Sequence, residues 1–177
     1  TSAIDSAAAQ AIQENPQAVD DYLKGKETAE AAHGASRIQL DNMQYDAVLE
    51  LTAGALPLAE GSPFQAQLLV DRGDALLEKG EQQAALTQYL LVVDNHGDSS
   101  IAPQALYNAT FALLDLKQYD EAMVRATAFV EKYKASSLLP DVSYLLGESQ
   151  LQQDKIVDAE ATFRKLIEEH SGHPQHS

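Results

Sequence analysis

The sequence of 177 residues contains no cysteine and no tryptophan, and only 12 of its side chains are Lys or Arg. Without cysteine, the chain can form no disulfide, thiolate metal site or cysteine nucleophile. Its 27 acidic side chains give a formal net charge of −15. A field of this sign repels the phosphates of nucleic acids and anionic lipid headgroups. We therefore expect a protein or peptide partner with apolar or basic character, and no nucleic acid.

Long apolar runs are also missing. None approaches the roughly 20 residues that span a bilayer, so we expect no direct membrane insertion. No signal peptide is visible, but the chain starts at Thr1 rather than Met. A processed or truncated product therefore stays open, as does a removed leader or lipid anchor.

The motifs of common catalytic sites do not occur. There is no glycine-rich phosphate loop, Gly-x-Ser-x-Gly elbow or His-Glu-x-x-His pair. The histidines His170, His173 and His176 recur every third residue, which fits a weak metal site or a polar C-terminus. Gly172 and Pro174 interrupt any helix there, which favours the polar C-terminus. We predict no enzyme, no cofactor and no metal site.

The chain does contain an internal repeat. Alanine, leucine and glutamine are abundant, which is a helical composition. A shift of the sequence by 37 residues aligns three copies, with a weaker fourth copy before them. The aligned sets are Gly73, Thr110 and Gly147; Ala85, Ala122 and Ala159; and Tyr89, Ala126 and Phe163, while Ser36, Tyr45 and Val48 belong to the weaker copy.

Each copy predicts two helices joined by a short turn. Apolar residues recur at three- and four-residue steps on both sides of residues 115–118, which form the turn of the third copy. Gly80 suits the corresponding turn of the second copy. Pro103 and Pro140 stand where helices begin, because proline fits the first helical turn. Small residues at the aligned positions allow the paired helices to approach closely. The fold class is therefore all-α.

These residues resemble the tetratricopeptide repeat, and the best copy is Leu146-Gly147 with Ala159 and Phe163. The sequence departs from that pattern at Ala126, in lacking the usual tryptophan, and in its period of 37 residues. The resemblance implies a right-handed α-solenoid of four helical hairpins with an N-terminal helical cap. The expected boundaries are 1–28 for the cap, 29–65, 66–102, 103–139 and 140–174 for the repeats, and 175–177 for a tail.

The long period is similar to that of bacterial envelope proteins of the YbgF/CpoB and BamD-like type. The stretch Pro103-Gln104-Ala105-Leu106-Tyr107 matches the way their repeats begin. This likeness favours the bacterial periplasm or cell envelope over the cytoplasm. The residues themselves do not identify the compartment.

The first 28 residues do not follow the repeat. An apolar stripe from Ile4 to Ile12 predicts one short helix, and Asn15-Pro16 predicts the start of a second. Such a pair would cap the end of the solenoid. Residues 15–27 also resemble a motif in the tail domain of the GatB amidotransferase subunit. That likeness gives the alternative function, an RNA- or tRNA-associated accessory domain.

The leading hypothesis is a non-catalytic protein–protein interaction module, a scaffold or adaptor that binds a peptide or protein segment in a concave groove. The tetratricopeptide likeness implies that five positions of each first helix line this groove. They are Gln67, Val70, Asp74, Leu77 and Glu78 in the second copy; Gln104, Tyr107, Phe111, Leu114 and Asp115 in the third; and Asp141, Tyr144, Glu148, Leu151 and Gln152 in the fourth.

Eight side chains are the predicted peptide-binding residues. Tyr107, Phe111 and Tyr144 are expected as apolar platforms, Asp74, Glu78, Asp115 and Glu148 as an anionic rim, and Asn108 as an amide that holds a ligand backbone. Packing of Tyr107 or Phe111 against a neighbouring repeat is the alternative. An apolar face at Ile156, Phe163 and Ile167 predicts homo-oligomers or further repeats beyond residue 177.

Overall fold

The computed structural model describes residues 16–170, and the side chains of residues 24–169. The described elements are all helices and no described residue lies in a strand, which confirms the predicted all-α solenoid of four hairpins. The elements are α2 (Pro16–Asp41), α3 (Tyr45–Ala55), the short 3-10 helix η1 (Leu56–Leu58), α4 (Phe64–Glu78), α5 (Gln82–Asn95), α6 (Ala102–Asp115), α7 (Tyr119–Lys132), α8 (Leu139–Gln152) and α9 (Ile156–His170).

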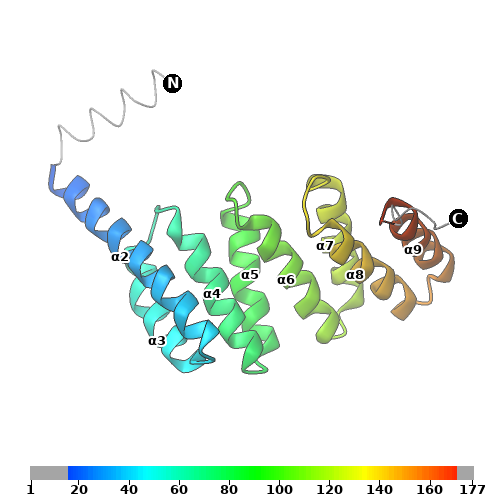
Figure 1. The fold of residues 1–177 in the computed structure, drawn as a ribbon, viewed down its shortest axis with the longest axis horizontal. Coiled ribbons are helices and arrows are strands. Elements are labelled where there is room, and N and C mark those ends of the chain that lie inside the picture. Colours follow the sequence, from blue (N-terminus) through cyan, green and yellow to red (C-terminus); the bar gives the residue numbers. More distant parts are fainter. Residues whose placement is uncertain (1–15, 171–177) are drawn as a thin grey trace, which may run out of the picture.

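The hairpins stack along the long axis of the molecule, from α2 at one end to α9 at the other (Figure 1). Each helix packs against the next one in sequence, and the first helices of neighbouring hairpins also touch one another. The molecule therefore has one side built by α2, α4, α6 and α8. None of the described helices is long and apolar enough to cross a membrane.

The four hairpin turns share one backbone geometry. A residue with positive φ follows the first helix of each hairpin: Met43 (56°), Gly80 (76°), Lys117 (59°) and Asp154 (54°). At the second turn the Glu81 N–H donates to the Leu76 carbonyl at 2.9 Å. The Gly80 N–H donates to the Leu77 carbonyl, also at 2.9 Å. This is the Schellman arrangement, and it ends the first helix at the same repeat position in every hairpin.

The core confirms the expected role of small residues. Ala85, Ala122 and Ala159 are fully buried at the helix crossings. A Cβ atom on Gly73 would lie 2.4 Å from Cε1 of Tyr89, and one on Gly147 would lie 2.5 Å from the Phe163 ring. Glycine at these sites lets the aromatic ring of the second helix rest on the backbone of the first.

The N-terminal part differs from the predicted cap. Pro16 begins a helix as expected, but α2 continues without a break to Asp41 and passes through the expected boundary between residues 28 and 29. Gly25 lies inside α2, where the helix passes close to the Leu58 backbone. A Cβ at this position would lie 2.5 Å from the Leu58 carbonyl oxygen. The predicted stripe from Ile4 to Ile12 lies outside the described residues, as do His173, His176 and the tail at 175–177.

The other repeat boundaries fall close to their predicted places. The first helices α4, α6 and α8 begin one or two residues before the expected starts at 66, 103 and 140. Pro103 and Pro140 occupy the first turns of α6 and α8. The turn at 115–118 separates α6 from α7, with only its first residue still helical.

Candidate functional site

Two adjoining hollows form one groove on the side built by the first helices, and we call it the α2–α4–α6 groove. Their volumes are about 480 and 410 Å³, and they share Arg37, Asp74 and Gln104. The first hollow is lined by His33, Arg37, Gln67, Val70, Asp71, Asp74, Ile101 and Gln104. The second is lined by Arg37, Leu40, Asp41, Tyr45, Asp74, Leu77, Glu78, Gln104 and Asn108.

The first carboxylate of the groove, Asp71, is almost fully buried at 1% exposure. Its Oδ2 lies 2.7 Å from Nδ1 of His33. The guanidinium of Arg37 lies 3.6 Å from its Oδ1. A buried carboxylate needs such partners, because the loss of solvation is costly. The contacts also tie α4 to α2 across the floor of the groove.

The second carboxylate, Asp74, joins three hairpins. Its Oδ1 accepts hydrogen bonds from the Tyr89 hydroxyl at 2.9 Å and from Nδ2 of Asn108 at 3.0 Å. Its Oδ2 lies 3.5 Å from Arg37. Nε2 of Gln104 in turn donates to Oδ1 of Asn108 at 2.8 Å. The network therefore fixes the orientation of the polar side chains along the groove.

Burial has the largest effect on the pKa values of Asp71, Asp74 and Tyr89. It raises the pKa of Asp74 to about 6, although Tyr89, Arg37 and Asn108 favour the charged form. Burial also raises the pKa of Asp71, against the opposing effect of His33 and Arg37. The pKa of Tyr89 is raised by burial and by the charge of Asp74, so this hydroxyl stays a donor.

One buried acceptor atom of the groove has no hydrogen-bond partner in the described structure. Oε1 of Gln67 is buried and accepts no hydrogen bond. An unsatisfied buried acceptor costs about 1–3 kcal/mol. Gln67 lines the first hollow, so a turn of its amide toward the hollow would bring Oε1 within reach of a donor placed there.

The structure brings three of the eight predicted binding residues into the groove, namely Asp74, Glu78 and Asn108. Glu78 is exposed and accepts a long hydrogen bond from the Tyr45 hydroxyl at 3.4 Å. Asn108 is buried, and its amide group already contacts Asp74 and Gln104. Asn108 therefore orients the groove wall instead of offering a free amide.

The other five residues lie along α6 and α8. Tyr107 is partly buried and packs against the cluster that contains Phe129 and Val142, which is the alternative stated for it above. Phe111 and Tyr144 are 37% and 51% exposed. Asp115 is exposed at the end of α6. Glu148 lies beside Tyr144, and its charge raises the pKa of the Tyr144 hydroxyl.

The residues that sequence reasoning missed come mainly from the first hairpin. They include His33, Arg37, Leu40 and Asp41. All four stand 37 residues before Val70, Asp74, Leu77 and Glu78. The five groove-lining positions that the tetratricopeptide likeness gave for the other copies, applied to the weak first copy, would have identified these residues. Asp71 likewise stands 37 residues before Asn108.

The groove brings together carboxylates, amides and a guanidinium. Within residues 24–169, no group of three or more His, Asp or Glu side chains could hold a metal ion. The carboxylates of Asp71 and Asp74 are engaged in contacts that stabilise the stack, and the groove is open along its length. The geometry offers fixed hydrogen-bond donors and acceptors to a partner.

Comparison with known proteins agrees with this geometry. A family model described as tetratricopeptide repeat matches residues 141–173, the copy that fits the pattern best in the sequence. Among solved structures, RapI in its apo form matches with a TM-score of 0.72 and 19% identity. The fold is a tetratricopeptide-like helical repeat.

The match with RapI covers 80% of this chain and 55% of RapI. The chain therefore spans about half of that protein. No curated protein matches the sequence of the repeat array. The likeness to envelope proteins, and with it the compartment, stays a prediction. The GatB-like motif stays a prediction as well.

Proposed function

We propose that the repeat array is a non-catalytic protein–protein interaction module that binds a peptide segment in the α2–α4–α6 groove. The tetratricopeptide-like helical repeat is a fold that typically binds proteins and performs no catalysis. The site supports this role through polar side chains that are already oriented before a ligand arrives.

The observation that carries the proposal is the unpartnered Oε1 of Gln67. It lies in a hollow whose neighbouring polar groups, Asp71, Asp74 and Gln104, are fixed by internal contacts. When the Gln67 amide turns toward the hollow, a backbone N–H of an extended peptide, or a lysine or arginine side chain, supplies the missing donor. Binding would then satisfy an acceptor that is costly in the free protein.

The charge of the groove favours a basic ligand. Asp41, Asp71, Asp74 and Glu78 contribute carboxylates, while Arg37 is the one guanidinium that lines either hollow. Asp41 and Glu78 are exposed at the rim, where they can attract a cationic side chain. This supports the predicted basic or apolar character of the partner. No observation on the described chain favours an RNA ligand.

A longer ligand can continue along the same side of the molecule. Phe111 and Tyr144 expose part of their rings on α6 and α8, the first helices of the third and fourth hairpins. They offer apolar platforms beyond the groove. Tyr107 is less suitable for testing this contact, because its packing against the Phe129 cluster would couple binding to stability.

The test uses an array of short basic, neutral and acidic peptides, followed by calorimetry on the tightest binder. We expect basic peptides to bind best. Gln67→Ala should weaken the affinity roughly fivefold to tenfold, since one buried hydrogen bond is lost. The same change should leave the stability of the free protein equal or higher, because it removes an unsatisfied acceptor.

Ser99→Ala is the matched control, because the Ser99 hydroxyl is also buried without a partner but does not line the groove. It should leave the affinity unchanged. Equal affinity of the wild type and Gln67→Ala would contradict the proposed groove. Preference for acidic peptides would contradict the proposed ligand class.

A further inference from the structure

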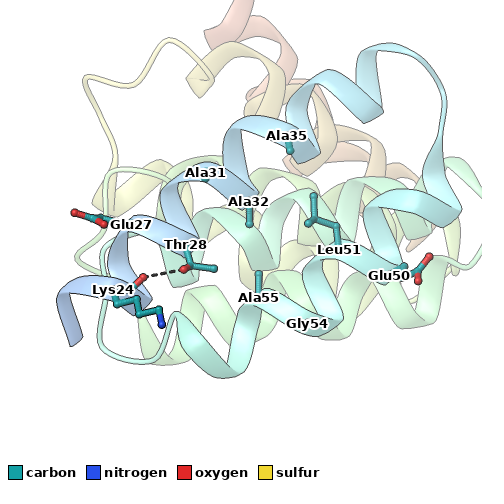
Figure 2. Close-up of a pocket in the computed structure, with 10 residues that line it drawn as sticks. All are labelled: Lys24, Glu27, Thr28, Ala31, Ala32, Ala35, Glu50, Leu51, Gly54 and Ala55. Atoms are coloured by element: carbon teal, nitrogen blue, oxygen red, sulfur yellow. Dashed lines mark hydrogen bonds between the residues drawn. The ribbon is translucent and has the colours of Figure 1, made fainter. Parts of the chain in front are cut away.

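A second groove lies between α2 and α3, at the N-terminal end of the described stack. Its volume is about 700 Å³. Small and apolar side chains of the two helices line most of it, and charged ones stand at its edge, as Figure 2 shows. The lining residues are Lys24, Glu27, Thr28, Ala31, Ala32, Ala35, Glu50, Leu51, Gly54 and Ala55.

The repeat explains this groove as an incomplete junction between hairpins. Six of its lining residues have counterparts three repeat lengths later that line a hollow on the fourth hairpin. These pairs are Thr28 and Leu139, Ala32 and Ser143, Ala35 and Leu146, Leu51 and Thr162, Gly54 and Lys165, and Ala55 and Leu166. At that hollow, Val130 and Glu131 of α7, together with Lys134 in the loop after α7, supply a further wall.

The burial of single positions agrees with a missing wall. Ala31 is exposed in the α2–α3 groove. Its counterparts Leu68, Ala105 and Val142 are fully buried. Val142, for example, packs in one cluster with Ala126 and Phe129 of the preceding second helix. Within the described residues, the first hairpin alone has no preceding second helix against this position.

The opposite end of the stack presents the complementary surface. Ile167 of α9 is 65% exposed. Its counterparts Leu56, Val93 and Val130 are partly buried against the hairpin that follows them. In the described chain, α9 is therefore a second helix whose face toward a next hairpin has no partner.

We propose that the α2–α3 groove receives α9 of a second copy of this chain. In this contact Ile167 of one copy packs against Ala31 of the other, as Val130 packs near Val142 inside each molecule. The two surfaces differ, so the contact is heterologous and continues the stack head to tail without closing. The proposal does not depend on the α2–α4–α6 groove.

Net charge sets the conditions for association. Each copy carries a formal charge of −15, so copies repel one another at low ionic strength. Salt screens this repulsion, with a Debye length of about 3 Å near 1 M salt. Association should therefore strengthen as salt is raised, because the docking surfaces are mainly apolar.

The absence of cysteine permits a direct cross-linking test. One population carries Ala31→Cys, and the other carries Ile167→Cys and a tag that changes its size. At high protein concentration and high salt under mild oxidation, we expect several-fold more mixed disulfide dimer than in a matched mixture where Val124→Cys replaces Ile167→Cys. Val124 is 60% exposed on α7, so its thiol is equally accessible.

A mixed yield no higher than with the Val124→Cys control would overturn the proposal. So would an excess of dimers that join two Ala31→Cys chains, since that result indicates a symmetric contact. Slow maleimide labelling of Ala31→Cys in dilute, monomeric protein would show that residues of the same chain cover the groove, and it would also overturn the proposal.

Sedimentation velocity gives an independent readout on the uncross-linked protein. The average sedimentation coefficient of the wild type should rise with concentration and with salt. Ala31→Glu should remain monomeric, while Val124→Glu should behave as the wild type, with circular dichroism confirming that both are folded. A wild type that stays monomeric at high salt would overturn the proposal.

Discussion

At the scale of single residues, the hairpins are held by pairs of side chains whose sizes complement each other. Gly73 faces Tyr89, and Gly147 faces Phe163. The third hairpin has the larger Thr110 at the first of these positions and the smaller Ala126 at the second, and both are fully buried. The total volume at the crossing is thus partly conserved while the individual residues change, as close packing requires.

Gly73→Ala should destabilise the protein by about 1–3 kcal/mol, because the new methyl group overlaps the buried Tyr89 ring. Urea unfolding followed by circular dichroism measures this change. Gly34→Ala is the matched control, since a Cβ at Gly34 within α2 meets no atom within 4 Å. That control should stabilise the protein by about 0.5–1 kcal/mol.

The penalty should disappear when Gly73→Ala is combined with Tyr89→Ala, which removes the ring that the methyl group would meet. A penalty that persists in this background would mean that the Gly73–Tyr89 contact is not its cause.

At the scale of helices and turns, the hairpin turns recur with the period of 37 residues. All four turns place one residue at positive φ, yet Gly80 is the only glycine among them. Met43, Lys117 and Asp154 adopt a conformation that costs a non-glycine residue about 1–2 kcal/mol. Packing of the hairpins compensates this cost.

Lys117→Gly should therefore raise the free energy of unfolding by about 0.5–1 kcal/mol, which is the relief of strain less the added entropy of glycine in the unfolded chain. Lys134→Gly, at an exposed loop position without positive φ, should give no such gain. Gly80→Ala should lose about 1 kcal/mol. Thermal unfolding of the three variants compares them, and a loss of stability in Lys117→Gly would argue against strain at this turn.

The sequence predicted the helices well wherever local signals agreed with the repeat. The prolines near the starts of α6 and α8 and the glycine after α4 gave the boundaries of the inner hairpins. The first hairpin was harder. Asn15-Pro16 correctly indicated a start, but no stop signal lies near residue 28, and Gly25 serves a close approach to Leu58 instead of ending the helix.

At the scale of the whole molecule, the groove could be predicted only in part. The repeat pattern predicts Asp74 and Glu78 on a concave lining, and both line the second hollow. The same register applied to the first copy reaches Arg37 and Asp41. The roles of these groups depend on contacts between hairpins. Asn108 donates to Asp74 at a separation of 34 residues, which no local pattern reveals.

Both grooves follow from the same stacking. Adjacent first helices create the polar α2–α4–α6 groove, where buried carboxylates are held by His33, Arg37 and Asn108. The ends of the stack leave the apolar α2–α3 groove and the face of α9 without partners in the described chain. We propose a basic peptide as the occupant of the first groove, and α9 of a second copy as the occupant of the second.

The central claim is that a peptide binds in the α2–α4–α6 groove, and amide NMR spectra of the protein with the best peptide from the array test it most directly. We predict that the largest shifts on titration occur at His33, Arg37, Gln67 and Gln104, with smaller shifts extending toward Phe111 and Tyr144. Val124 and its neighbours on α7 should not shift. The account would be contradicted if the largest shifts occurred on α7 or at the α2–α3 groove while His33, Arg37, Gln67 and Gln104 did not shift.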